Sequence, residues 1–186
     1  TLDRISDGRV ELGLGVGWLK EEFDALGVPW EARGARNDEY VAAMRALWRE
    51  PHVEFHGKYV DFDKVTCSPR PVNGSIPVIV GGDTDAALRR AARHADGYFP
   101  GEGDPKKLAE LIGRLHAEAE KIGREPAEIK INIMFGAQMA DPAAGIAELK
   151  ALGVDRIMVP AFFFAGEDGL DRLQQFGDTI IPMAND

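Results

Sequence analysis

The sequence has little cysteine, little clustered positive charge and no long apolar run. Cys67 is its single cysteine, so neither an intrachain disulfide nor a zinc cluster of cysteines can form, and a reducing, cytoplasmic compartment is expected. The 186 residues include 22 Lys and Arg against 31 Asp and Glu, a formal net charge of -9, and no basic run is longer than two residues. This balance disfavours nucleic acid and anionic membrane surfaces as partners.

No stretch approaches the roughly 18 consecutive apolar residues of a membrane span, and the first residues lack the basic and apolar regions of a secretory signal. With 45% apolar and 28% charged residues, the composition is that of one globular domain over 1–186. Thr1 is not a methionine, and residues 1–5 are typical of a helix end that enters the turn Ser6–Gly8. We therefore expect the chain to begin inside a longer protein.

From Gly8 onward, apolar stretches of strand length alternate with stretches of helical period, which is typical of parallel βα units. The strands are rich in β-branched and aromatic residues and poor in charge, as expected when both faces are covered. Five are predicted, over Arg9–Gly15, Pro77–Gly81, Gly97–Pro100, Lys130–Phe135 and Arg156–Pro160.

Between the strands, apolar residues recur every three or four positions, and Pro, Asp and Gly mark helix starts and ends. Helices are predicted over Arg36–Arg49, Thr84–His94, Pro105–Ile122, Pro142–Leu152 and Leu170–Ile181. One segment departs from this rhythm: His52–Phe62 alternates around His56-Gly57 and predicts a β-hairpin, and a Pro-rich connection follows it. Residues 51–76 are therefore interpreted as an insertion.

A closed (β/α)8 barrel takes about 250 residues, whereas five units and an insertion use the whole of this chain. The sequence thus predicts an α/β fold, an incomplete TIM barrel of about five βα units with a β-hairpin insertion. Five strands leave two sheet edges unpaired. We expect those edges to be covered, by homo-oligomerisation, by domain swapping or by association with a missing N-terminal portion.

Several blocks in order resemble the luciferase-like monooxygenase superfamily, in its F420-dependent oxidoreductase branch. Thr1–Trp18 resembles the family's fourth strand with its preceding turn. Further blocks cover nearly the whole chain: Glu21-Glu22-Phe23, Leu26-Gly27, Arg36, Glu39-Tyr40, Leu47-Trp48, Phe55-His-Gly-Lys-Tyr59, Pro69-Arg-Pro71, Ile76–Gly82, Ala86–Ala92, Ala95–Gly97 and Gly153–Arg156. The resemblance implies a barrel of the bacterial luciferase type, represented here by its C-terminal part, strands 4 to 8.

The resemblance implies an oxidoreductase that transfers hydride between coenzyme F420 and a small organic substrate, with the cofactor supplying the chemistry. An FMN-dependent monooxygenase shares most of these residues and is the alternative. In this family the first three strands supply most groups around the cofactor ring. The chain is therefore expected to carry an incomplete active site, and a non-catalytic barrel fragment without tight cofactor binding is a third reading.

Glycines mark the expected cofactor-binding positions, because ligands of parallel barrels sit at the carboxyl ends of the strands. Gly13, Gly15 and Gly17 alternate along one strand and clear one of its faces. For Gly13 we favour relief of crowding, whereas for Gly15 and Gly17 crowding and cofactor binding stand as equal alternatives.

The second group is Val80, Gly81, Gly82 and Thr84, a strand end that leads into a helix start. Backbone N–H groups there suit a phosphate, and Thr84 adds a hydroxyl donor, whereas Asp83 would oppose an anion unless it points away. The family's use of this loop near the cofactor tail supports the assignment. No catalytic residue is identified, and no metal site is assigned because the four histidines have no ligand spacing to one another.

Overall fold

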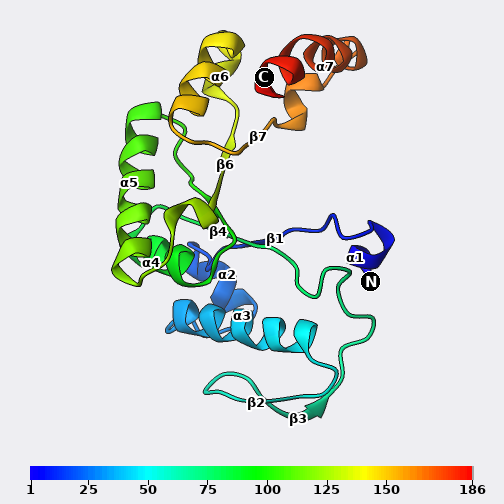
Figure 1. Cartoon of the computed structure of the whole chain (residues 1–186), viewed down its shortest axis with the longest axis vertical. Coiled ribbons are helices and arrows are strands. Elements are labelled where there is room, and N and C mark those ends of the chain that lie inside the picture. The colour runs from blue at the N-terminus through cyan, green and yellow to red at the C-terminus, as the bar shows by residue number, and fades with distance from the viewer. Residues whose placement is uncertain (186) are drawn as a thin grey trace.

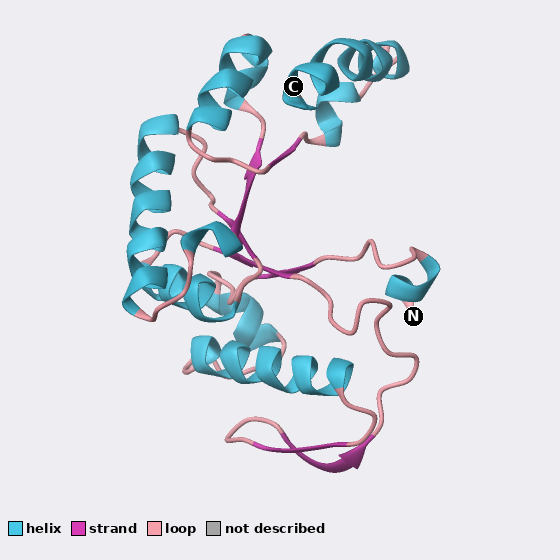
Figure 2. Ribbon diagram, in the orientation of Figure 1, coloured by secondary structure: helices cyan, strands magenta, loops and turns pink. Residues whose placement is uncertain are grey.

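The fold of the computed structural model, which describes residues 1–185, is built on a five-stranded parallel sheet (Figure 2). The strands follow the order β1-β4-β5-β6-β7, and every neighbouring pair is parallel. Their bounds are β1 Leu12–Leu14, β4 Val78–Gly81, β5 Gly97–Phe99, β6 Lys130–Met134 and β7 Arg156–Met158. All five predicted strands are confirmed, each shorter than its apolar stretch because only these residues pair with a neighbour.

The long helices between successive strands lie along one side of the sheet (Figure 1). Their bounds are α1 Leu2–Ile5, α2 Lys20–Ala25, α3 Arg33–Arg49, α4 Asp85–His94, α5 Pro105–Lys121, α6 Pro142–Ala151 and α7 Gly169–Asn185. Three short 3-10 turns, η1 Pro126–Glu128, η2 Ala137–Ala140 and η3 Ala161–Phe164, complete the described elements. The expected alternation of strands and helices is thus confirmed.

Local capping explains where the central helices begin. The side chains of Thr84, Asp104 and Asp141 accept hydrogen bonds from the first N–H groups of α4, α5 and α6, respectively. α3 instead begins at Arg33, three residues before the predicted start, after Ala32 in the left-handed region with φ of 56°. No side chain caps that helix start, so the sequence carries no signal for it.

The core lies between the sheet and the helices α4 and α5. Val78, Val80 and Tyr98 point from β4 and β5 toward the helices, where Leu88 and Leu108 are at most 1% exposed. Burying a side chain of this size stabilises the fold by about 2 kcal/mol, so this layer holds the sheet at its centre. The faces of β4 and β5 that point away from the helices do not belong to this core.

Residues 51–76 lie outside the main sheet, between α3 and β4. They contain an antiparallel hairpin of β2 Val53–His56 and β3 Asp61–Val65, which extends three residues beyond the predicted Phe62. The hairpin lies beyond α3, away from the main sheet (Figure 1). Glu39 of α3 holds its turn by accepting the N–H groups of Lys58, Tyr59 and Val60 at 3.0, 2.6 and 2.7 Å.

The main sheet is open. β1 pairs only with β4 and β7 only with β6, so within residues 1–185 the two outer strands do not meet through a backbone ladder. The five βα units therefore form part of a parallel barrel-like arrangement without closing it. None of the helices in this range combines the length and apolar character that crossing a bilayer demands.

Candidate functional site

The carboxyl ends of all five parallel strands meet at one edge of the sheet, and a cavity of about 430 Å³ opens on the face that the helices leave free. That volume lies within the range of small-molecule sites. Its lining comes from all five strands and the residues beside them: Glu11, Gly13, Leu14, Gly15, Ile79, Gly81, Phe99, Asn132, Arg156 and Met158. The lining runs from Glu11 and Arg156 at strand starts to the carboxyl ends, so the cavity includes the edge at which parallel barrels bind ligands.

Glycines keep one wall of the cavity flat. A Cβ atom on Gly15 would meet no heavy atom within 4 Å, and one on Gly81 would lie 3.4 Å from the carbonyl oxygen of Phe99. The absence of side chains therefore leaves room for a ligand and relieves no severe crowding at either position. Gly13 has the same open surroundings and also lines the cavity, so crowding does not explain it either.

The deep end of the cavity is polar. Glu11, just before β1, forms an ion pair with Arg156, the first residue of β7, so the pair connects the two outer strands across the open face. The hydrogen bond to Glu11 raises the pKa of the Arg156 guanidinium. Asn132, only 3% exposed, donates from Nδ2 to the carbonyl oxygens of Lys130 and Tyr98 at 3.1 and 3.4 Å. The cavity thus has apolar residues along its wall and the Glu11–Arg156 ion pair at one end.

The loop from β4 to α4 follows directly on this wall. Gly82 has φ of 112°, a backbone conformation that L side chains rarely adopt, and Thr84 caps α4 by accepting the Ala87 N–H at 3.2 Å. The first N–H groups of a helix lack intrahelical partners and carry the positive end of its dipole. The chain therefore has a turn and a helix start beside the cavity that favour negative charge.

Asp83 turns away from this helix start. Its Oδ1 accepts the Gly101 N–H at 2.9 Å and lies 3.4 Å from the hydroxyl oxygen of Tyr98. Burial and the nearby Asp83 charge raise the pKa of the Tyr98 phenol, so it is a neutral donor here. Asp83 thereby ties the β4 loop to the β5 loop, and its charge is engaged there. An anion at the start of α4 requires that Asp83 be directed elsewhere. Asp83 bonds to the β5 loop, and Thr84 is the residue that caps α4.

The structure brings only part of the predicted set to the cavity. Gly15 and Gly81 line it, whereas Gly82 and Thr84 follow Gly81 in the chain and are not among the lining residues. Val80 is 2% exposed and points into the core, so its backbone alone faces the loop. Gly17 lies outside the lining with φ of 80°, packed so closely under Phe23 that a Cβ would come within 2.6 Å of its ring. Gly17 is thus explained by the turn that leads to α2.

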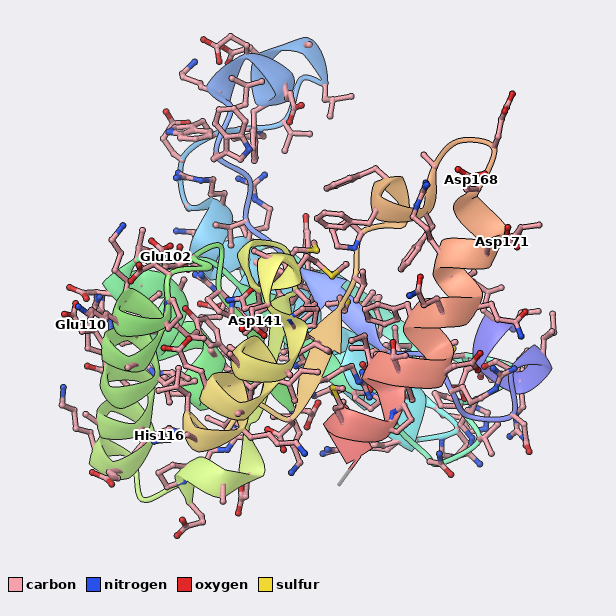
Figure 3. The ribbon with its side chains drawn as sticks, turned by 90° about the horizontal axis from the view of Figure 1, so that it is seen from above. Glu102, Glu110, His116, Asp141, Asp168 and Asp171 are labelled. Atoms are coloured by element: carbon pink, nitrogen blue, oxygen red, sulfur yellow. The ribbon has the colours of Figure 1, made fainter. Side chains whose placement is uncertain are left out.

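Glu102 and Asp141, on the helix layer, serve local structure instead. Glu102 and Asp141 lie near the starts of α5 and α6, and Glu110 and His116 project from α5 (Figure 3). Glu102 accepts the N–H groups of Gly103 and Asp104, and these bonds, with the one from Lys107, lower its pKa. None of these four residues contributes to the cavity lining.

Glu11, Asn132 and Arg156 are the site residues that sequence reasoning missed. The strand alternation that singled out Gly13 and Gly15 also places Glu11 on the same face, and the alternation of Lys130–Met134 places Asn132 inward. The ion pair itself joins residues 145 positions apart. Alternation reveals which face a residue occupies, whereas the pairing needs the three-dimensional sheet.

The parallel sheet, its helix layer and a cavity that reaches the carboxyl edge define an α/β protein of the parallel-barrel class. Comparison of the sequence with family models narrows this class. The model of the luciferase-like monooxygenases matches residues 1–165, and the chain belongs to that family. The family resemblance inferred from the sequence blocks is thereby confirmed.

Two curated relatives resemble the chain in sequence, and one of them is named for a cofactor. The "Uncharacterized protein Rv0940c" of Mycobacterium tuberculosis is 38% identical over 160 residues, which are 86% of this chain and 54% of the relative. An FMNH(2)-dependent dimethylsulfone monooxygenase of Pseudomonas putida is 31% identical over 127 residues, 66% of this chain and 35% of the relative. The chain thus spans about half, or less, of the length of these curated relatives.

Among solved structures, an F420-dependent secondary alcohol dehydrogenase in complex with an F420-acetone adduct matches with a TM-score of 0.78. The match covers 100% of this chain and 73% of that one at 18% identity, so it shows a common fold. The proteins that resemble this chain in sequence or in fold thus include one named for each of the two cofactors considered from the sequence.

Proposed function

We propose that this chain forms the part of a flavin-type binding site that holds the cofactor's phosphate tail, in an oxidoreductase that acts on a small organic substrate. The observation that carries the proposal is the glycine-walled cavity, which reaches Gly81, the residue before the turn that leads into α4. A planar ring or its chain can approach the backbone at Gly15 and Gly81 because no side chain covers it.

The tail would bind at Gly82, Thr84 and the first N–H groups of α4. The Thr84 oxygen already accepts one helix N–H, and its own hydroxyl hydrogen is free to be donated to a phosphate oxygen. Asp83 is held in the neighbouring loop, so its charge is directed away from the helix start. These residues fit a phosphate, and they would bind and orient the cofactor without taking part in bond making.

When bound, the cofactor supplies the hydride transfer. The chain's own groups at the cavity orient the ligand and exclude water, through Phe99 and Met158 on the apolar wall and Asn132 at the floor. Among residues 1–185, the carboxylate that lines the cavity is Glu11, and Arg156 neutralises it. We therefore assign no general acid or base to this chain, and the group that exchanges a proton with the substrate is proposed to come from other strands of the complete site.

Coenzyme F420 is the proposed cofactor, on the sequence blocks Gly15-Val-Gly-Trp18 and Val80-Gly-Gly82 and on the fold shared with the F420-dependent alcohol dehydrogenase. FMN in a monooxygenase is the second candidate, because the FMNH(2)-dependent dimethylsulfone monooxygenase is 31% identical over two thirds of this chain. Both cofactors carry a phosphate on a ribityl-type chain, so the same loop serves either one.

The open sheet edges support a further part of the proposal. β1 and β7 each have one edge without a partner within residues 1–185, and such edges pair readily with other strands. We propose that additional strands, from the same longer protein or from a second copy, cover these edges and complete the site. Analytical ultracentrifugation and thermal unfolding of the chain test this proposal. A monomer that unfolds in one cooperative transition contradicts it.

Spectral titration of the 186-residue chain with F420, FMN and riboflavin tests the cofactor proposal. Binding of F420 tighter than FMN supports the first candidate, and the reverse order supports the second. Riboflavin lacks the phosphate, so a preference of FMN over riboflavin of at least tenfold, about 1.4 kcal/mol, measures the contribution of the α4 start. Binding of none of the three favours a structural fragment and overturns the proposed site in this chain.

A further inference from the structure

The hairpin β2–β3 carries a cluster of ionisable side chains that the cavity does not use. Its strands pair Phe55 with Phe62 and His56 with Asp61, and the two phenylalanine rings stack with centroids 6.0 Å apart on the inner face. Alternation then places Glu54 and His56 of one strand, and Asp61 and Asp63 of the other, on the exposed face. Three carboxylates and one imidazole thus share one side of a two-stranded ribbon.

The distances within this cluster suit a bound cation. His56 Nδ1 lies 2.7 Å from Asp61 Oδ1, and His56 Nε2 lies 3.4 Å from Asp63 Oδ1. One ligand atom each from Glu54, His56 and Asp63 lie within 4.8 Å of one another. Ligands held about 2.1 Å from a tetrahedral Zn²⁺ are about 3.4 Å apart, so small rotations of exposed side chains bring all three onto one ion.

The contacts of His56 place one ring nitrogen beside each aspartate. Nδ1 lies 2.7 Å from Asp61 and can donate to it, and Nε2 faces Asp63 at 3.4 Å, where a metal ion would take the place of the Nε2 hydrogen. Histidine ligands of metals commonly donate their other N–H to a carboxylate in this way, which orients the ring and raises its basicity.

Charge balance points in the same direction. Within the described residues, Asp61 and Asp63 form ion pairs with His56 and with no lysine or arginine, and Glu54 forms none. Like charges that face each other across a ribbon destabilise it. A divalent cation between Glu54, His56 and Asp63 removes this repulsion and links β2 to β3 through side chains from both strands.

We propose that the exposed face of the hairpin is a binding site for a divalent first-row transition metal ion, with Glu54, His56 Nε2 and Asp63 as ligands and Asp61 as the residue that positions His56. One nitrogen and two carboxylate oxygens form a borderline donor set that suits Zn²⁺ better than Ca²⁺ or Mg²⁺, which prefer oxygen alone. Water completes the coordination, since the side chains are largely exposed. The site shares no residue with the cavity, so a test of the metal site and a test of the cofactor site give independent results.

Isothermal titration of the tag-free chain with ZnCl₂, in a buffer without phosphate or chelator, tests the site. We expect one Zn²⁺ per chain, and binding at least tenfold weaker in His56→Gln and in Asp63→Asn. His116→Gln is the matched control, because it removes a histidine from α5 outside the cluster, and we expect it to bind as the wild type does. Absence of binding in the wild type, or equal loss in His116→Gln, overturns the site.

A second measurement needs no variant and therefore does not depend on the folding of one. In long-range ¹H–¹⁵N spectra of the histidine rings, Zn²⁺ should shift Nε2 of His56 and leave its Nδ1 protonated. A first shift at His52, His94 or His116 overturns the assignment.

Asp61 tests the positioning role. Asp61→Ala removes the acceptor of the Nδ1 hydrogen bond, so we expect about tenfold weaker Zn²⁺ binding, whereas Asp61→Asn keeps an acceptor oxygen and should lose less. Equal binding by Asp61→Ala and the wild type contradicts the positioning role.

Discussion

The two ends of the parallel sheet are built in opposite ways. At the amino end, Asp96 accepts the Val78 N–H at 2.8 Å and Asp155 accepts the Ile131 N–H at 2.8 Å, so an aspartate before one strand holds the start of its neighbour. At the carboxyl end, β4 ends at Gly81 and β1 is followed by Gly15, and both glycines line the cavity. Charged side chains thus hold strand starts, whereas glycines clear the ends of two strands, which separates residues that stabilise the sheet from residues that could contact a ligand.

Asp96→Ala is expected to have the largest effect, and it acts at the amino end. The change removes the acceptor of the Val78 N–H and the partner of Arg45, whose Nη2 lies 2.7 Å from the carboxylate. The free energy of unfolding should fall by about 2 kcal/mol, because a strand N–H and a half-buried guanidinium lose a charged acceptor. Thermal unfolding should then occur about 5 °C lower, with cofactor affinity unchanged in whatever remains folded.

Asp85→Ala is the control for that change. Asp85 pairs with Arg114 on the helix layer, but its side chain is 72% exposed, so its loss should lower stability by less than about 0.5 kcal/mol. Equal destabilisation by the two variants would show that the amino end of the sheet has no special role.

Gly81→Leu attacks the carboxyl end. A leucine side chain would project from Gly81 into the cavity, so we expect at least tenfold weaker binding of the cofactor, about 1.4 kcal/mol, with little change in stability. Gly81→Ala should bind nearly as the wild type does, since the added methyl meets only the carbonyl oxygens of Phe99 and Leu14, at 3.4 and 3.9 Å. Spectral titration checks both, and unchanged affinity in Gly81→Leu would remove the cavity as the cofactor site.

Gly113→Ala is the control that distinguishes the loss of cofactor binding in Gly81→Leu from any general effect of replacing a glycine. Gly113 lies on α5 with no neighbouring atom within 4 Å of an added Cβ, so the change should leave cofactor binding intact.

The difference between the two ends also explains what sequence could foresee. The strands and most helices follow from local features, such as the Pro105 and Pro142 starts with an aspartate before each, and these predictions are confirmed. α2 was missed because it has six residues and no side-chain cap. The glycines at the strand ends can be recognised in the sequence. The burial of Val80 and the packing of Gly17 under Phe23 depend on side-chain directions, which the sequence pattern does not specify.

The hairpin shows the same limit. Alternation predicted two strands, but it placed the turn at His56-Gly57, whereas the turn extends to Val60 and β3 continues to Val65. Glu39, twenty residues earlier on α3, holds that turn through three backbone N–H groups. A carboxylate that binds a distant turn leaves no local trace in sequence.

Glu39→Gln should produce a smaller effect than the previous changes, and one that depends on pH. Burial raises the pKa of Glu39, but the N–H donors of Tyr59, Val60 and Lys58 outweigh it and hold the pKa below its ordinary value of 4.5. A carboxyl with a lowered folded pKa stabilises the fold above its unfolded pKa and loses that contribution as pH falls through the folded one. At pH 7 the variant should therefore unfold about 2 °C below the wild type, and the difference should shrink as pH falls below 4.5.

Glu110→Gln serves as the control, because it changes the same residue type on α5 away from the hairpin. A difference between Glu39→Gln and wild type that grows on acidification would contradict the assigned direction of the pKa change.

The Glu11–Arg156 pair gives the smallest expected effect and the sharpest test of the open sheet. Its side chains are 34% and 53% exposed, so a double-mutant cycle with Glu11→Gln and Arg156→Gln should give a coupling below about 1 kcal/mol that weakens in high salt. If further strands close the face, water leaves the pair and the coupling should rise to several times this value and resist salt. A strong, salt-resistant coupling would mean that further strands close the barrel around the pair. The amino and carboxyl ends of the sheet would then differ only in how deeply their residues lie inside that barrel.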